Sequence, residues 1–199
     1  RRVFLARGAG AVVAGLAAWA VWIEPRRLVV RRLRFPVRDL PRALDGLRVL
    51  PLTDLHLGPV VSAARLRAVV DEANALRPDL VALTGDYVHD SPAYIPRVAA
   101  LLGCLRPRLG VVGVLGNHDH WEGAEASRAA LRRAGVILVE NRHVVLGPEG
   151  ITTATRPGTL CIGGVGDLWE DSPNLDQALA GVDPRTPRIV LCHNPDYAE

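Results

Sequence analysis

From residue 47 onward, short apolar segments alternate with segments of helical periodicity. Each apolar segment has the length of a buried strand; these segments are residues 47–52, 80–83, 111–115 and 136–139. The predicted helices between them are residues 62–76, 94–105 and 123–134. Ser62 is suited to cap the first helix and Pro78 to end it. This repeated strand-helix-strand order predicts an α/β fold with a largely parallel sheet covered by helices.

The second half of the sequence has a different pattern. Residues 142–146 and 159–162 are predicted strands, joined by a region rich in Gly, Thr and Pro with no long helix. A second, partly antiparallel sheet is therefore predicted. A short helix at residues 174–180 and a buried strand at residues 189–192 complete the pattern.

The first 34 residues differ from the rest and are predicted to be a targeting or membrane segment, followed by one domain at residues 35–199. An uncharged apolar stretch from Gly8 to Ile23 follows Arg1-Arg2-Val3-Phe4-Leu5. It is shorter than the ~20 residues that span a bilayer comfortably. The order R-R-x-F-L resembles a twin-arginine export signal, which implies an extracytoplasmic domain. The alternative is an inner-membrane anchor with positive flanks and a cytoplasmic catalytic domain.

Charge is distributed unevenly between these two parts. The chain carries +3, and residues 1–34 hold eight Arg and one Glu, or +7, which leaves −4 for the remainder. The domain therefore offers no broad basic surface, and no nucleic-acid partner is predicted. Cys104, Cys161 and Cys192 lie in apolar runs without a C-x-x-C pattern and are interpreted as small buried side chains.

Polar and ionisable residues follow four of the predicted strands directly. These clusters are Asp54 and His56, Asp86, Asn117 to Asp119, and His193 with Asn194. Taken singly, each is most simply a turn, cap or surface residue. In open α/β sheets, however, ligands gather at the carboxyl ends of strands, so four such clusters favour a shared site.

The residue types in these clusters suit divalent cations. Asp54 and His56 are two positions apart, so an extended backbone would direct both toward one ion. Asp86 could bridge two ions, and Asn117 and His193 would supply oxygen and nitrogen to the second. Mixed nitrogen and oxygen ligation without thiolate suits Mn, Fe, Zn or Ni.

In this order, D-x-H, G-D, G-N-H-D and a later strand-end His resemble the calcineurin-like metallophosphoesterase family. The longer sequence segments around these motifs are similar to the membrane-associated bacterial branch of the family. This branch includes enzymes acting on UDP-2,3-diacylglucosamine and exported twin-arginine phosphoesterases. The matching segments are Asp54-Leu55-His56-Leu57-Gly58, Gly85-Asp86-Tyr87-Val88, Gly116-Asn117-His118-Asp119-His120-Trp121, Gly166-Asp167-Leu168-Trp169 and His193-Asn194-Pro195-Asp196.

The resemblance implies a four-layer αββα sandwich with two mixed β-sheets and a metal site at the strand carboxyl ends. It implies that Asp54, His56 and Asp86 bind one of two divalent cations. Asp86, Asn117 and His193 would bind the other. His118 would donate a proton or hydrogen bond near the leaving group, and Asp119 would orient its ring.

The implied activity is hydrolysis of phosphoester or pyrophosphate bonds by a water activated between two metal ions. The implied substrate is a phosphorylated small molecule or a lipid-linked nucleotide sugar at the membrane. Retention of His118 favours this enzyme over the alternative, a catalytically inactive homologue that binds metal or phosphate.

Two other enzyme classes are not supported by the sequence. Gly163-Gly164-Val165-Gly166 is not followed by the third glycine and long helix of a dinucleotide-binding motif, since Trp169 takes that glycine's place. A G-x-S-x-G motif of serine hydrolases is absent from the sequence.

The sequence departs from the family pattern at one point. The family has a G-H-x-H element downstream of the position of His193, and this chain has none. We therefore expect a C-terminally truncated sequence whose remaining ligands follow Glu199, and the lack of Met at position 1 also indicates a fragment. His89, His120 and His143 do not fit that element and receive no role.

Overall fold

The computed structural model describes residues 13, 15–24, 27–154 and 156–198. The chain divides into two compact units, Arg1–Phe35 and Pro36–Glu199. The targeting role of residues 1–34 stays a prediction, and Arg1-Arg2-Val3-Phe4-Leu5 lies outside the described residues.

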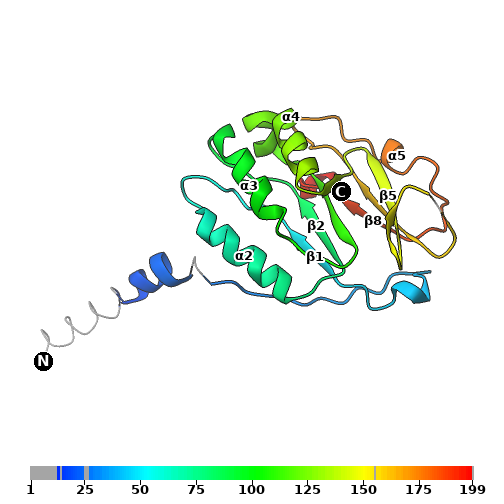
Figure 1. The fold of residues 1–199 in the computed structure, drawn as a ribbon, viewed down its shortest axis with the longest axis horizontal. Helices are drawn as coiled ribbons and strands as arrows, with labels where there is room; N and C mark the ends of the chain where they lie inside the picture. Colours follow the sequence, from blue (N-terminus) through cyan, green and yellow to red (C-terminus); the bar gives the residue numbers. More distant parts are fainter. Residues whose placement is uncertain (1–12, 14, 25–26, 155, 199) are drawn as a thin grey trace, which may run out of the picture. The chain divides into compact units, whose positions relative to one another are not determined.

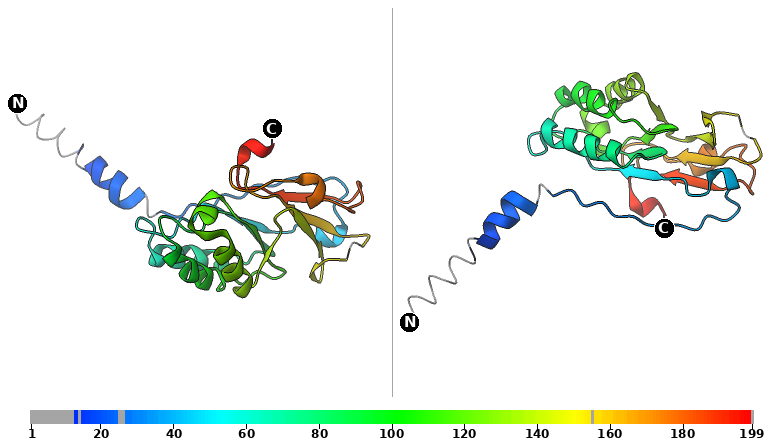
Figure 2. Two further views of the ribbon diagram at one scale, coloured as in Figure 1. Left: turned by 90° about the horizontal axis from the view of Figure 1, so that it is seen from above. Right: turned by 60° about the horizontal axis from the view of Figure 1, so that its bottom comes forward.

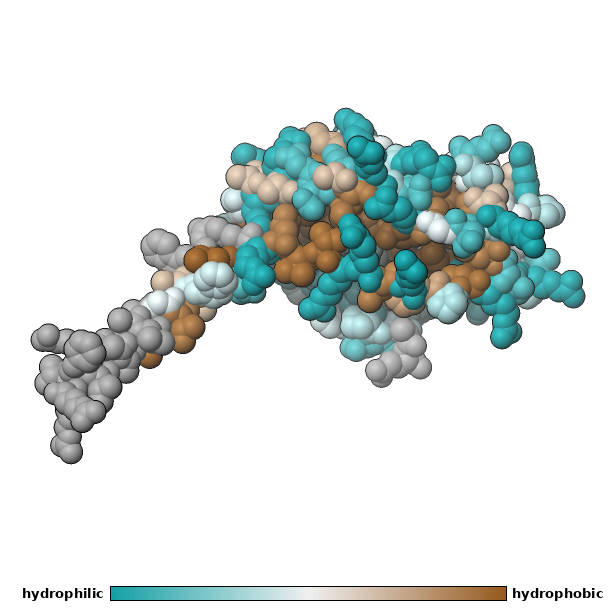
Figure 3. Space-filling model, turned by 90° about the horizontal axis from the view of Figure 1, so that it is seen from below, coloured by the Kyte–Doolittle hydropathy of each residue, from teal (hydrophilic) through white to brown (hydrophobic). Residues whose placement is uncertain are grey.

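In the first unit, the described residues are helical at first and include the π-helix η1 (Trp19–Ile23). They expose an apolar surface, visible in Figure 3, to which Val13, Leu16, Trp19, Val21 and Ile23 contribute. Across the part of the chain that the structure describes, no helix combines the length and the apolar character needed to cross a bilayer.

The first sheet of the second unit has four parallel strands in the order of the sequence (Figure 1). They are β1 (Val49–Leu52), β2 (Leu80–Thr84), β3 (Gly110–Val114) and β4 (Val136–Leu138). The connecting helices are α2 (Ala63–Ala75), α3 (Ile95–Leu102) and α4 (Asn117–Arg133). Because crossovers between parallel strands share one hand, all three helices cover the same face of the sheet.

The second sheet is mixed, in the order β6-β5-β7-β8. Its strands are β5 (Arg142–Gly147), β6 (Gly150–Thr152), β7 (Leu160–Gly164) and β8 (Arg188–Leu191). β5 is antiparallel to β6 and β7, whereas β7 and β8 are parallel. The expectation of two mixed sheets is therefore wrong for the first sheet, where each described pair of strands is joined by a helical crossover.

The two sheets pack face to face, with helices on the outside (Figure 2). Leu80, Ala82, Val112 and Val114 of the first sheet meet Val144, Leu146, Leu160 and Ile162 of the second. The alternate residues of the first sheet contact its helices. The short helix α5 (Leu175–Ala178) lies on the outer face of the second sheet, where the Ala178 carbonyl is 2.7 Å from Nδ1 of His143. The predicted αββα order is thus present, with a thin fourth layer.

The start of α2 follows the predicted cap, whereas the start of α4 differs from the prediction. The Ser62 side chain accepts a hydrogen bond from the Arg65 N–H at the start of α2, as expected of an N-cap. Helix α4, however, begins at Asn117, six residues before the predicted start. Gly123 lies inside it with a left-handed φ of 131°, so the helix is kinked where its start was predicted. Pro92–Tyr94 forms the short helix η4 before α3, and η3 (Arg42–Leu44) and η5 (Pro195–Ala198) are also 3₁₀ helices.

Ile162, which is fully buried between the sheets, provides a test of this packing. We expect Ile162→Ala to lower the free energy of unfolding by about 2–5 kcal/mol, because it removes buried methyl groups and leaves a cavity. Ile137→Ala is the control, since this β4 side chain is 37% exposed, and it should cost less than about 1 kcal/mol. Urea unfolding without added metal measures both changes, and equal losses would contradict the assigned core.

Candidate metal centre

The carboxyl ends of β1, β2, β3 and β8 bring the predicted residues to one place. Asp54 and His56 follow β1, and Asp86 follows β2 in the adjacent position of the same parallel sheet. Asn117 begins α4 just after β3. His193 follows β8 in the other sheet, and its Nδ1 lies 2.8 Å from the carbonyl oxygen of Thr84 at the end of β2. The sandwich therefore joins the two sheets at this edge.

Asp86 lies at the middle of the group and is 3% exposed. Its Oδ2 is 3.5 Å from Nε2 of His56 and 3.5 Å from Nε2 of His193. Nε2 of His56 is also 3.5 Å from Oδ1 of Asp54, and Nε2 of His193 is 3.2 Å from Oδ1 of Asn117. Two ligands about 2.1 Å from one tetrahedral ion lie about 3.4 Å apart, so these separations suit a shared metal environment.

The orientation of His193 favours metal ligation by Nε2. Nδ1 faces the Thr84 carbonyl, to which it can only donate a hydrogen bond, so this contact holds the proton on Nδ1. In the neutral ring, Nε2 then presents its lone pair toward Asp86 and Asn117. Asp86 raises the pKa of His193 to about 9. Burial opposes ionisation of Asp86, yet His193 and the backbone N–H of His118 hold the Asp86 pKa below its usual value. The centre therefore favours a positive charge beside Asp86.

The backbone of the ligand loops is in an uncommon conformation. Asp54, His56 and Asp86 have φ values of 52°, 43° and 56°, in the left-handed region that costs most residues about 1–3 kcal/mol. The extended backbone expected between Asp54 and His56 is therefore wrong. Hydrogen bonds from the Asp54 and His56 N–H groups to the carbonyls of Gly85 and Asp86, at 3.1 and 2.9 Å, hold the two loops together instead.

Two glycines allow these loops to approach. A Cβ atom on Gly85 would lie 2.5 Å from the Gly116 nitrogen and 2.9 Å from Nδ1 of His193. A Cβ atom on Gly116 would overlap Oδ1 of Asp86 and lie 2.8 Å from Cε1 of His193. Because Gly116 has no side chain, the side chains of Asp86 and His193 can occupy the space beside it.

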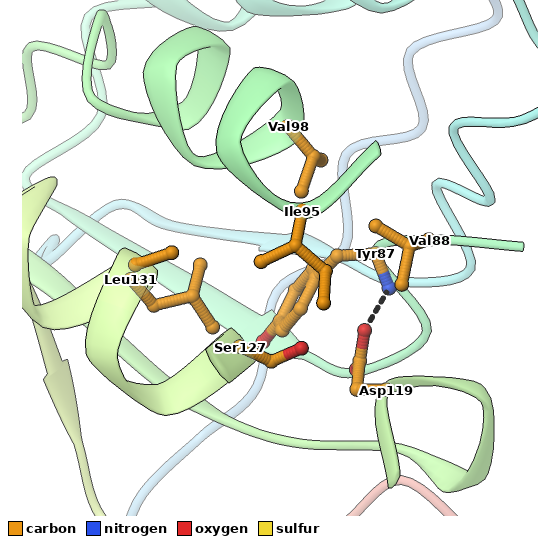
Figure 4. A pocket seen from close by; sticks show the side chains of 8 residues that line it. Tyr87, Val88, Ile95, Val98, Asp119, Ser127 and Leu131 are labelled. Carbon is orange, nitrogen blue, oxygen red and sulfur yellow. Dashed lines mark hydrogen bonds between the residues drawn. The ribbon is translucent and has the colours of Figure 1, made fainter. Parts of the chain in front are cut away.

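Asp119 was predicted to orient the His118 ring, but its hydrogen bonds go to other groups. It is the third residue of α4, and its carboxylate accepts hydrogen bonds from the N–H groups of Gly116 (3.0 Å), Asp86 (2.8 Å) and Tyr87 (2.9 Å). Figure 4 shows the Asp119 carboxylate facing the Tyr87 nitrogen. Burial raises the Asp119 pKa to about 7, although the hydrogen bonds from these N–H groups lower it. A helix start with free N–H groups captures this carboxylate, so Asp119 connects the end of β2 to α4.

The partner of the His118 ring is His89, a residue without a role in the sequence prediction. The Nδ1 atoms of the two rings are 3.1 Å apart, a hydrogen bond in which one ring donates. The His118 ring is also 4.8 Å from the His56 ring between centroids. Burial lowers the His118 pKa, the Asp86 carboxylate opposes this shift, and the neighbouring His56 and His89 add to it. His89 is three residues after Asp86 in one loop, a spacing that could have drawn attention to it.

The other two histidines without a predicted role lie in different surroundings. His143 contacts α5 on the outer face of the second sheet. His120 lies beside Glu140 and Asp171, with ligand atoms of the three residues within 4.8 Å of one another. Arg128 pairs with Glu140 at 2.9 Å and approaches Asp171 to 3.6 Å, so it already balances these carboxylates.

Comparison with known proteins agrees with this arrangement. The family profile described as calcineurin-like phosphoesterase matches residues 47–199. The chain belongs to this family.

Two curated relatives are similar over most of this chain. A "Transmembrane protein with metallophosphoesterase domain" from Danio rerio is 32% identical over 176 residues, or 84% of this chain and 39% of the relative. "UDP-2,3-diacylglucosamine pyrophosphatase LpxG" from Chlamydia trachomatis is 28% identical over 218 residues, or 89% of this chain and 66% of the relative. The chain thus spans less than two thirds of either relative. Among solved structures, TT1561 of Thermus thermophilus aligns with a TM-score of 0.40 and 18% identity, over 73% of this chain and 57% of that chain.

Gly116→Ala tests whether close packing of the loops shapes the centre. Because the added methyl group would displace Asp86 and His193, we expect Mn²⁺ to bind roughly 10- to 100-fold more weakly, as when a group supporting metal ligands is lost. Gly147→Ala is the control, since a Cβ atom there meets no atom closer than 3.9 Å. Calorimetric titration measures both affinities, and circular dichroism checks the fold. An unchanged affinity in Gly116→Ala would contradict the assignment.

Proposed function

We propose that this chain hydrolyses phosphoester or pyrophosphate bonds with two divalent cations drawn from Mn, Fe, Zn or Ni. The observation that carries the proposal is the equal 3.5 Å separation of Asp86 Oδ2 from Nε2 of His56 and of His193. A carboxylate between two imidazole nitrogens suits a pair of ions that share it. Membership of the calcineurin-like phosphoesterase family supports the same chemistry.

In this proposal Asp54, His56 and Asp86 hold one ion. Asp86, Asn117 and His193 hold the other. When bound, the two ions supply Lewis acidity at the phosphoryl oxygens and lower the pKa of a water molecule. Oxygen and imidazole donors without thiolate fit such ions, and all five side chains converge where the strand ends of the two sheets meet.

His118 acts on the leaving group. The contact with His89 occupies Nδ1 of His118, so Nε2 is the ring nitrogen available to donate a proton to the leaving oxygen. The His118 backbone N–H donates a 3.0 Å hydrogen bond to Oδ1 of Asp86, which fixes the residue beside the centre. Two roles then differ physically: Asp86 binds cations, whereas His118 moves a proton and His89 positions its ring.

Substrate and location are further parts of the proposal. A relative is named a UDP-2,3-diacylglucosamine pyrophosphatase and another a transmembrane protein, which supports a lipid-linked nucleotide sugar at a membrane. The apolar surface of the first unit supports membrane association through residues 1–35. The two orientations remain export through a twin-arginine signal and anchoring with the catalytic domain in the cytoplasm.

Substitution of Asp86, His118 and His89 separates metal binding from proton transfer. We expect Asp86→Ala to lose bound metal, because it removes the shared carboxylate. We expect His118→Ala to keep both metals and to lose about 10²–10⁴-fold in kcat for bis-p-nitrophenyl phosphate with Mn²⁺. His89→Ala should keep the metals and lose roughly 10- to 100-fold, since the ring of His118 is no longer held.

The double variant His89→Ala/His118→Ala tests whether His89 acts only by holding the ring of His118. It should be no slower than His118→Ala alone, because residues that act as one unit are not additive. Equal metal loss in the Asp86 and His118 variants would refute the role of His118. A wild-type protein that binds metal without turnover would support the alternative, an inactive homologue that binds metal or phosphate.

Membrane association is tested by vesicle flotation. We expect the protein to float with vesicles that contain anionic lipid, and a variant without residues 1–35 to stay in the soluble fraction, because the exposed apolar side chains of this unit would be removed. Equal flotation of both proteins would contradict the proposal. Protease protection in cells then distinguishes the two orientations.

A further inference from the structure

We infer that Trp121 binds the leaving group of the substrate, and that this leaving group carries a planar ring. Trp121 lies in α4, three residues after His118, on the same side of the helix. Its ring centroid is 4.6 Å from that of His118, with an angle of 62° between the planes. Despite this contact, Trp121 is 55% exposed. A large apolar ring is therefore open to ligand directly beside the proposed proton donor.

The orientation of Trp121 is fixed at its polar end. Its indole Nε1 donates a 2.8 Å hydrogen bond to Oε1 of Glu170. The Glu170 backbone N–H in turn donates to Oδ1 of Asp167, a residue that is 1% exposed. The ring is therefore held by a chain of contacts that ends at the buried Asp167.

The loop that holds Trp121 also contacts the segment that carries His193. The backbone N–H of Leu168 donates a 2.8 Å hydrogen bond to Oδ1 of Asn194, the residue after His193. The same loop exposes 63% of Trp169 and 36% of Leu168. The segment 167–170 thus contacts Trp121 through Glu170 and the residue after His193 through Leu168.

The inference rests on the proposed function, because it places the leaving group by the role of His118. In hydrolysis, the oxygen of water bonds to phosphorus and the bond from phosphorus to the leaving oxygen breaks. The proton on Nε2 of His118 passes to that leaving oxygen, and the proton that the water gives up restores the one lost from His118. A leaving group within reach of His118 lies within reach of Trp121, whose ring centroid is 4.6 Å from the imidazole. Stacked or edge-to-face rings gain about 0.5–1.5 kcal/mol beyond burial, so a planar ring is the group that this surface selects.

Phenylphosphonate and methylphosphonate test the inference, since neither is hydrolysed and they differ by the ring. With Mn²⁺ bound, we expect the wild-type protein to bind phenylphosphonate about three- to tenfold more tightly than methylphosphonate in a calorimetric titration. Trp121→Ala should remove this preference by weakening phenylphosphonate alone. Trp121→Phe should restore most of it, because phenylalanine keeps a ring. Trp19→Ala is the matched control, an exposed tryptophan of the first unit, and should leave both affinities unchanged.

Each outcome bears on the inference separately from turnover. Equal binding of the two phosphonates by the wild-type protein would overturn it. So would an equal loss of both in Trp121→Ala, which would assign Trp121 to support of the metal centre. If Trp121→Ala fails to fold, Trp121→Phe and Trp121→Leu provide the comparison, and equal ring preference in these two would also overturn it. A ring preference in a protein without turnover would contradict the proposed function alone.

Discussion

The buried carboxylate of Asp86 joins all the parts of the candidate centre. Oδ2 faces the imidazoles of His56 and His193, each at 3.5 Å, and Oδ1 accepts the His118 N–H. The backbone of the same residue donates to Asp119 and accepts from His56. An ionised group at this depth needs compensation from opposite charge and hydrogen bonds. The surrounding loops are arranged so that their histidines and N–H groups supply this compensation. A pair of bound cations would complete the compensation of the Asp86 charge.

The backbone around Asp86 accepts unfavourable conformations to reach this geometry. Asp54, His56 and Asp86 all have positive φ, and Gly85 and Gly116 approach so closely that neither has room for a side chain. The packed sheets and helices that carry these loops provide the stabilisation that offsets their unfavourable backbone conformations. Two separate apolar clusters, one under the helices and one between the sheets, hold the strand ends in fixed positions. Three of the seven described non-glycine residues with positive φ thus lie where the ligands meet.

The sequence predicted the order of the elements and the four polar clusters well, because strand length, periodicity and caps are local properties. It failed where tertiary contacts decide. Helix α4 starts early because Asp119 is captured by free N–H groups near Gly116, and the kink at Gly123 looks like a helix start in the sequence. The spacing of His89 from Asp86 could place it near the site, but its contact with His118 depends on the fold of the turn after Asp86. Strand β6 has no fully buried residue, whereas the equally short β4 has two, so β6 lacks the apolar run by which a short strand is recognised.

The sharing of the centre between two sheets affects the order of events during folding. Asp54 and His193 are separated by 139 positions, and they meet only when the sheets have packed through Leu80, Val112 and Ile162. Contacts of such long range form late, because closing the intervening chain costs entropy before the contact forms. His193 therefore joins the other ligands only in the packed sandwich, whereas Asp54, His56 and Asp86 follow neighbouring strands of one sheet. A cation held by the complete set would stabilise the finished sandwich and slow its unfolding.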